Sequence, residues 1–230
     1  MNFKAFNFLK LSFLFTAVCL ITACVKNDNL IKGDTKVRFF NNVDQLSQDF
    51  YLNGIRRTTT TGISYGNSTD YLVYEGDKEY NILAKNTGST KIGDSIKYTF
   101  GIGKNYSVFY TKTSEIDSLL TIYEDNLTPD PANARLFFIN LGYTLDSKVN
   151  IRNRTSSFTA SLANGENSVY IVLKPDSNAK IFLNLVNSTS VIDTIPATNF
   201  YKGKTYTIII DGVNKGVNKG KLRERLIVNN

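Results

Sequence analysis

An internal repeat of about one hundred residues accounts for most of this chain. Lys36–Asn41 aligns with Arg135–Asn140 at an offset of 99 residues, and Gly103–Val108 aligns with Gly203–Ile208 at an offset of 100. Two more matches at the offset of 99 lie between these: Leu52–Gly54 with Ile151–Asn153, and Ile63–Val73 with Leu162–Val172. Four matches in one order, at a nearly constant offset, indicate the duplication of a unit the size of a small domain.

The proline-rich segment 129–133 marks the boundary between the two copies. It contains two of the four prolines of the chain, and proline interrupts both helices and strands. We therefore predict a first domain over residues 35–128, a linker over 129–133 and a second domain over 134–230.

Each copy has the pattern of an all-β domain. Short apolar runs rich in Tyr, Phe, Ile, Val and Thr alternate with turn residues, and no stretch shows a helical period. Asn53-Gly54 is a strong signal for a two-residue hairpin turn, because both residue types tolerate a positive φ. Seven or eight short strands in roughly a hundred residues are typical of an immunoglobulin-like Greek-key β-sandwich. A barrel is the alternative.

The first residues have the pattern of a secretory signal peptide, with Lys4 and Lys10 before an apolar stretch over 11–21. The segment Leu20–Cys24 resembles the lipobox of bacterial lipoproteins, in which the signal is removed before a cysteine that then carries lipid. We therefore expect a signal peptide over 1–23, cleavage between Ala23 and Cys24, and lipidation of Cys24. Residues 24–34 are polar and would form the lipidated tether. Two or three acyl chains are enough for stable attachment to a membrane.

Composition argues against several classes of enzyme. The chain has no His, which excludes His-based catalytic triads and His-ligated metals. Its carboxylates are scattered, and no stretch has the alternating pattern of a calcium loop. Only Cys24 survives removal of the signal, so the mature chain has no intrachain disulfide. We expect no catalytic residue, no metal and no cofactor.

The positive charge is concentrated at the C-terminal end. The formal net charge is +7, and residues 201–230 contain seven basic and two acidic residues. Lys215, Lys219 and Lys221 have no counterpart in the first copy, so this basic hairpin is the candidate ligand site, for acidic glycans or lipid phosphates. A solvated loop tip is the alternative. Nucleic acid is not an expected partner, because a secreted lipoprotein has little access to it.

Two pairs of tyrosines occur in both copies, Tyr71 with Tyr170 and Tyr106 with Tyr206. We expect these four residues to serve the fold, since a buried Tyr packs its ring and hydrogen-bonds through its hydroxyl. Three segments, Asp94–Ile96, Asp117–Leu119 and Asp193–Ile195, resemble a short O-glycosylation sequon, and Asp residues that cap turns explain them equally well.

At the level of the mature chain, the sequence resembles a family of Bacteroidota lipoproteins classed as domain of unknown function 4397. The residues that carry the resemblance are Val37–Asn41, Tyr51–Gly54, Tyr65-Gly66 and Lys104–Val108. In the second copy Phe137 stands in place of Arg38, and Asn164 in place of Tyr65. The resemblance implies tandem immunoglobulin-like sandwiches outside the cytoplasm and supplies no catalytic residue.

These observations predict a non-enzymatic binding or adhesion module of the cell envelope, attached to the outer membrane by a lipid on Cys24. Its expected partner is a glycan or an envelope protein, and the sequence leaves open whether it faces the periplasm or the cell surface. One alternative is a structural accessory subunit of an outer-membrane complex. A second alternative is a hydrolase that acts on an envelope polysaccharide.

Overall fold

The structure is a computed structural model that describes residues 33–44, 46–188, 193–213 and 221–230. The predicted signal peptide and the lipidation site Cys24 lie outside the described residues. Among the described residues, no helix has the length and apolar character needed to cross a membrane.

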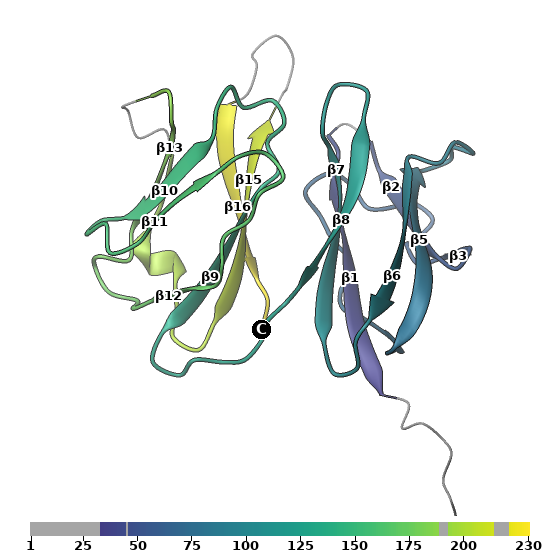
Figure 1. The fold of residues 1–230 in the computed structure, drawn as a ribbon, viewed down its shortest axis with the longest axis horizontal. Coiled ribbons are helices and arrows are strands. Elements are labelled where there is room, and N and C mark those ends of the chain that lie inside the picture. The colour runs from purple at the N-terminus through teal and green to yellow at the C-terminus, as the bar shows by residue number, and fades with distance from the viewer. Residues whose placement is uncertain (1–32, 45, 189–192, 214–220) are drawn as a thin grey trace, which may run out of the picture. The chain divides into compact units, whose positions relative to one another are not determined.

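The first half of the chain forms two four-stranded sheets (Figure 1). The β1 sheet has the strand order β4-β1-β7-β8, and the β2 sheet has the order β3-β2-β5-β6. The strands are β1 (Asp34–Asn42), β2 (Gln48–Leu52), β3 (Ile55–Arg56), β4 (Leu72–Glu75), β5 (Lys78–Asn86), β6 (Asp94–Phe100), β7 (Asn105–Lys112) and β8 (Ser118–Glu124).

The second half repeats this plan. The β9 sheet has the order β12-β9-β15-β16, and the β10 sheet has the order β11-β10-β13-β14. The elements are β9 (Ala134–Asn140), β10 (Val149–Asn153), β11 (Thr159–Leu162), β12 (Ile171–Leu173), β13 (Ile181–Leu185), β14 (Asp193–Ile195), the 3-10 turn η1 (Ala197–Asn199), β15 (Thr205–Val213) and β16 (Lys221–Val228). The predicted all-β sandwich class is confirmed, whereas the immunoglobulin-type detail and the domain boundaries stay predictions.

The two halves also share their strand pairing. In the first, β1 pairs in parallel with β7, and Lys36 lies opposite Asn105. In the second, β9 pairs in parallel with β15, and Arg135 lies opposite Thr205. The aligned sequence segments therefore occupy the same places in the two sandwiches.

Each sandwich has its own apolar core between its two sheets. The equivalent residues Phe39 and Phe138 are both fully buried in these cores. The tyrosine hydroxyls also repeat one hydrogen bond: Tyr106 accepts from the Gly101 N–H at 3.0 Å, and Tyr206 accepts from the Tyr201 N–H at 2.9 Å. These contacts support the structural role that we expected for this pair of tyrosines.

The hairpin between β2 and β3 turns at Asn53 and Gly54, whose φ angles are 48° and 78°. Positive φ at both central residues is the geometry that Asn-Gly favours, because its twist matches that of the flanking strands. The structure therefore contains the two-residue turn expected here.

A third apolar cluster joins the β1 sheet of the first sandwich to the β9 sheet of the second. It contains side chains from β1, β7, β9 and β15 and from the residue after β9: Phe40, Phe109, Phe137, Ile139, Leu141 and Ile209. Successive residues of a strand point to opposite faces of its sheet, so the runs Phe39-Phe40 and Phe137-Phe138 each supply one side chain to a sandwich core and one to this interface. The two sandwiches are thus held together by apolar packing between sheets.

Candidate functional site

The sequence-predicted site residues fall mostly outside the described residues. Ala23, Cys24, Lys215 and Lys219 all lie there. Lys221 is described, and it is the exposed first residue of β16. The structure therefore supports no account of a basic hairpin, and the candidate site comes from a different part of the chain.

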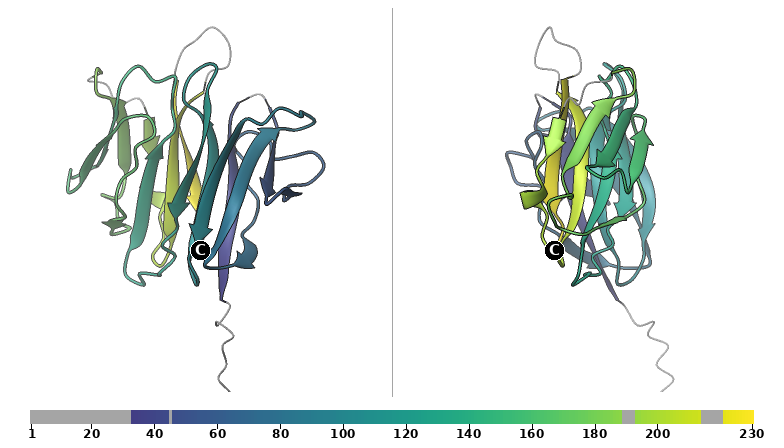
Figure 2. Two further views of the ribbon diagram at one scale, coloured as in Figure 1. Left: turned by 45° about the vertical axis from the view of Figure 1, so that its right-hand side comes forward. Right: turned by 90° about the vertical axis from the view of Figure 1, so that its left-hand side faces the viewer.

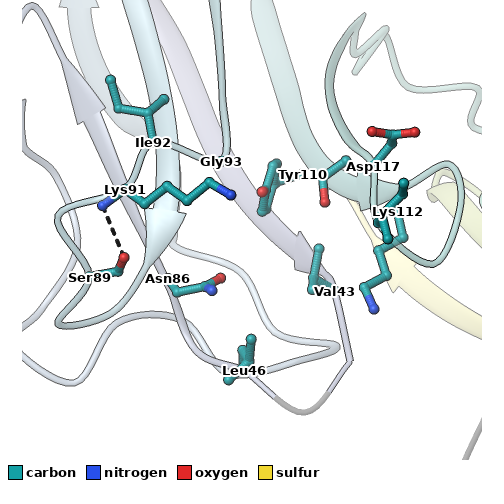
Figure 3. Close-up of a pocket in the computed structure, with 12 residues that line it drawn as sticks. Val43, Leu46, Asn86, Ser89, Lys91, Ile92, Gly93, Tyr110, Lys112 and Asp117 are labelled. Carbon is teal, nitrogen blue, oxygen red and sulfur yellow. Dashed lines mark hydrogen bonds between the residues drawn. The ribbon is translucent and has the colours of Figure 1, made fainter.

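A pocket of about 420 Å³ lies at one end of the first sandwich (Figure 3). It is open between the end of β7, the start of β8, and the loops that follow β1 and β5. We call it the loop-end pocket. Its lining residues are Val43, Leu46, Asn86, Ser89, Lys91, Ile92, Gly93, Tyr110, Lys112, Ile116, Asp117 and Ser118.

Tyr110 and Gly93 form a closely packed part of the pocket wall. Tyr110 is almost fully buried, and its ring meets that of Phe50 edge-on at a centroid distance of 6.5 Å. A Cβ atom added to Gly93 would lie 2.0 Å from the Tyr110 hydroxyl oxygen. Only glycine therefore fits at position 93 while Tyr110 stays in place.

The pocket contains two lysines with different surroundings. The Lys112 ammonium lies 3.9 Å from the Asp44 carboxylate. Asp117 is held within its own loop, where its carboxylate accepts a hydrogen bond from the Ser114 hydroxyl at 3.1 Å. Within the described residues, the Lys91 ammonium makes no hydrogen bond or ion pair. Lys91 therefore offers a positive charge that an anionic ligand can neutralise.

Aliphatic side chains surround this charge. Leu46, Ile92 and Ile116 line the pocket and are 48%, 53% and 92% exposed. Exposed aliphatic groups around a partly enclosed polar hollow are typical of binding sites, where a ligand covers them.

The second sandwich lacks the features that make this pocket. The residues aligned with Val43 and Lys112 are Gly142 and Gly212, and the residue aligned with Leu46 is Leu145. The Leu145 side chain packs directly on both glycines, because a Cβ atom on Gly142 would lie 2.6 Å from it and one on Gly212 would lie 3.1 Å from it. Leu145 also packs against the core of the second sandwich, whereas Leu46 remains half-exposed. In the part of the chain that the structure describes, the loop-end pocket is thus found in the first copy.

A buried polar cluster lies beside the interface between the sandwiches. Arg38 donates to the Ser107 hydroxyl at 2.8 Å and to the Asn229 amide oxygen at 2.6 Å, and its guanidinium lies 3.7 Å from Asp125. Tyr71 donates a hydrogen bond of 2.7 Å to the Asp125 carboxylate. Burial raises the pKa of Asp125 above its usual range, and the Arg38 charge opposes that rise. Because each charge here has a partner, we read this cluster as structural.

Tyr71 and Tyr170, which we expected to serve the fold, both contact the segment after β8. Tyr71 reaches Asp125, and the Tyr170 hydroxyl oxygen accepts from the Asn126 N–H at 2.9 Å. Two of the sequon-like Asp carboxylates accept backbone hydrogen bonds. Asp94 of β6 accepts from the N–H of Leu120 in β8 at 2.7 Å, which is a contact between strands, and Asp193 accepts from the neighbouring Thr194 N–H at 2.8 Å.

One carboxylate has a pKa close to neutrality. Burial and the neighbouring Asp193 carboxylate raise the pKa of Glu224 to about 7. A glycoside hydrolase needs its two carboxyl groups about 5 Å or more apart, whereas Glu224 and Asp193 are hydrogen-bonded to each other. Neither residue lines the loop-end pocket. Among the described residues, no group of three or more potential metal ligands comes together.

Comparison with known proteins identifies the family of the first copy. Residues 35–147 match the model of a family described as Domain of unknown function (DUF4397). This segment belongs to the DUF4397 family. The DUF4397 match contains every residue that lines the loop-end pocket and also contains the first strand of the second sandwich, β9. Because the function of DUF4397 domains is unknown, the match assigns no role to these residues.

No curated protein matches the chain. Among solved structures, the chain is similar to the crystal structure of CBMbc, of family CBM26, from Eubacterium rectale Amy13K in complex with maltoheptaose. The two chains share 10% sequence identity with a TM-score of 0.25, and the similarity covers 82% of this chain and 96% of that chain. A similarity this distant does not indicate that the DUF4397 segment shares a ligand with that protein.

Proposed function

We propose that this protein is a non-enzymatic binding module, attached to the outer membrane by a lipid on Cys24, and that the loop-end pocket holds its ligand. The lipobox-like residues before Cys24 support the anchor. The binding role rests on one observation: within the described residues, Lys91 has no acidic partner and lies in a pocket of the first copy that the second copy does not repeat.

The course of β1 supports this role. The strand begins at Asp34, ten residues after Cys24, and ends at Asn42, next to the pocket residue Val43. At about 3.3 Å per residue, a strand of this length spans roughly 30 Å. The first residue of β1, which follows the predicted tether in the sequence, and the pocket therefore lie at opposite ends of the strand.

The lining of the pocket defines the chemistry of its ligand. Lys91 favours a carboxylate or phosphate, and Asn86, Ser89 and Ser118 offer hydrogen bonds to polar atoms around it. The exposed aliphatic side chains favour apolar surface next to that charge. The ligand of the loop-end pocket is thus an anionic group flanked by apolar atoms, carried by a component of the envelope.

Charge reversal at Lys91 tests the binding site. The full chain, purified in detergent and immobilised, is exposed to the protein and polysaccharide fractions of the host envelope. We expect K91E to lose at least nine-tenths of the retained ligand. The matched control is K97E, because Lys97 is an exposed lysine of the same sandwich that lies 3.7 Å from Glu79 and outside the pocket. Equal retention by wild type and K91E would reject the pocket as the ligand site.

Substitution of Cys24 tests the anchor separately. The C24S chain should no longer incorporate labelled fatty acid and should move from the membrane fraction to the soluble fraction. Protease treatment of intact cells that express the wild-type chain then shows whether the module faces outward. Continued labelling of C24S would reject lipidation at this cysteine.

A specific surface feature favours the accessory subunit as a second candidate function. The edge strand β12 of the β9 sheet contains Val172, which is 59% exposed, and nearby Val169 is 81% exposed. An exposed apolar edge is suited to the addition of a strand from a partner. In that case a V172K substitution would release the partner and K91E would not, which is the reverse of the result expected for the loop-end pocket.

A further inference from the structure

The second sandwich has a different hollow, on the face of the β10 sheet that points away from its core. Figure 2 (right) shows the ribbon from the side of the second sandwich. The strand register places Asn150 between Ser161 and Asn184, and it places Arg152 between Thr159 and Phe182. The hollow measures about 510 Å³, which is within the range of ligand sites. We call it the β10-face pocket, and it is lined by Asn150, Ile151, Arg152, Thr159, Ala160, Ser161 and Asn184.

The first sandwich has larger side chains at the corresponding place. Tyr51, which aligns with Asn150, lies opposite Leu83 in the β2 sheet. The Lys85 ammonium lies 4.8 Å from the centre of the Tyr51 ring and covers it. In the second sandwich the two opposed residues are both asparagines, Asn150 and Asn184. The β10-face pocket therefore lies where the second sandwich has the short side chains of Asn150 and Asn184 and the first has Tyr51 and Leu83.

The polar groups of this face have chemistry that suits a sugar. Asn150 supplies an amide that both donates and accepts hydrogen bonds, and Thr159 and Ser161 supply hydroxyls. Asn184 supplies an acceptor oxygen, because its NH2 group already donates to the carbonyls of Leu185 and Ser188 at 3.1 and 3.2 Å. These groups lie on neighbouring strands, so they form an extended patch that matches a chain of hydroxyl groups better than a single small molecule.

The charge of the face is positive. The Arg152 guanidinium lies 4.6 Å from the centre of the Phe182 ring, and the Lys180 ammonium lies 5.4 Å from the same ring. Arg152 forms no ion pair within the described residues. The only carboxylate in β10, β11, β13 and β14 is Asp193, which hydrogen-bonds to Glu224 of β16. Nothing on these four strands therefore competes for the Arg152 guanidinium.

We propose that the β10-face pocket is a second binding site, and that its ligand is an oligosaccharide that contains uronic acid residues. Arg152 pairs with a sugar carboxylate, for which its planar fork of donors is well suited. Asn150 and Asn184 bind the hydroxyls of the adjoining sugars. This site shares no residue with the loop-end pocket, so it does not depend on the function proposed for that pocket.

Calorimetric titration of the full chain in detergent, with hexagalacturonate as the probe and maltohexaose as the neutral probe of equal length, tests this site. The expected result is saturable binding of hexagalacturonate at 150 mM salt and at least tenfold weaker binding of maltohexaose. N150Y, which introduces the residue of the first copy, should weaken hexagalacturonate binding at least tenfold. R152A should do the same, and R152K should have an intermediate effect because lysine lacks the bidentate fork.

Matched controls separate this site from other parts of the protein. Y51N changes the corresponding position of the first sandwich and should leave hexagalacturonate binding unchanged, as should K91E in the loop-end pocket. If N150Y fails to fold, as judged by its thermal transition, N184L and R152A provide the same test. Absence of hexagalacturonate binding by the wild type, equal binding of maltohexaose, or undiminished binding by folded N150Y, N184L or R152A would each overturn the proposal.

Discussion

The two sandwiches have the same strand order and the same parallel pairing, but their hollows lie in different places. In the first, Val43 and Lys112 line the loop-end pocket, whereas Gly142 and Gly212 stand at the aligned positions of the second and the Leu145 side chain packs on both of them. On the outer face of the β10 sheet the second sandwich has the hollow, and Tyr51 and Leu83 stand at the corresponding place in the first.

This difference shows which parts of the unit were free to diverge. The pairs Phe39 with Phe138 and Tyr106 with Tyr206 keep the core and its hydrogen bonds the same in both copies. The two hollows depend instead on the size of a few side chains at the ends and faces of the sheets. A change in those side chains alters which ligand fits and leaves the packing of the sheets intact.

The shared core predicts equal and large effects of equivalent substitutions. F39A and F138A should each lower the free energy of unfolding by about 4 kcal/mol, because each removes a fully buried aromatic ring. Urea titration of the full chain measures both. If either variant is too unstable to titrate, F39L and F138L provide a milder pair. If the free energy of unfolding falls several times more for one variant than for the other, the two cores are not equivalent.

The tight packing around Gly212 in the second sandwich predicts a loss of stability smaller than that of the core substitutions. G212A should lower the free energy of unfolding by about 2 kcal/mol, since its Cβ atom would lie 2.3 Å from the Thr144 hydroxyl oxygen and 3.1 Å from Leu145. K112A, at the aligned position of the open end, should change it by about 0.5 kcal/mol or less. Thermal unfolding of both variants measures these changes in stability. An equal loss of stability in G212A and K112A would mean that the two ends are packed alike.

The contact between Glu224 of β16 and Asp193 of β14 predicts the smallest effect, which is a dependence of the free energy of unfolding on pH. The pKa of Glu224 is about 7 in the folded protein, against 4.5 for the free group. Protonated Glu224 therefore contributes stability that is fully present below about pH 4.5 and is lost as the pH rises through about 7. We expect a loss of about 1 kcal/mol between pH 5 and pH 8, reduced from the full linkage value because Glu224 is only partly buried.

E224Q should remove this pH dependence, and equilibrium unfolding at a series of pH values checks it. A wild-type stability that rises between pH 5 and pH 8 would contradict the raised pKa of Glu224.

The sequence predicted the repeat and the β class because both depend on local patterns. The turn at Asn53-Gly54 and the strands around Tyr106 and Tyr206 follow from φ preferences and from alternation. The interface between the sandwiches was missed, although Phe39-Phe40 signals it. Two consecutive aromatic residues in one strand point to opposite faces, which indicates a strand that is buried on both sides.

The candidate site was less accessible to sequence analysis. The basic hairpin was singled out because its charge is unique to one copy, yet Lys215 and Lys219 lie outside the described residues. The loop-end pocket depends on residues far apart in the chain, such as Lys91 and Lys112, whose proximity no local pattern encodes. The alignment did contain one signal, the replacement of Lys112 by Gly212, which indicated that the two copies differ at this end.

The position of β1 has a mechanical consequence. It directly follows the predicted tether in the sequence, and it lies between β4 and β7, with the parallel ladder to β7 running from Lys36 to Asn42. A force that pulls the start of β1 along the strand axis loads this ladder in shear, so it must strain the hydrogen bonds of the ladder together and not one after another. A module that grips a ligand at one end and a membrane at the other would thereby resist being pulled apart by flow.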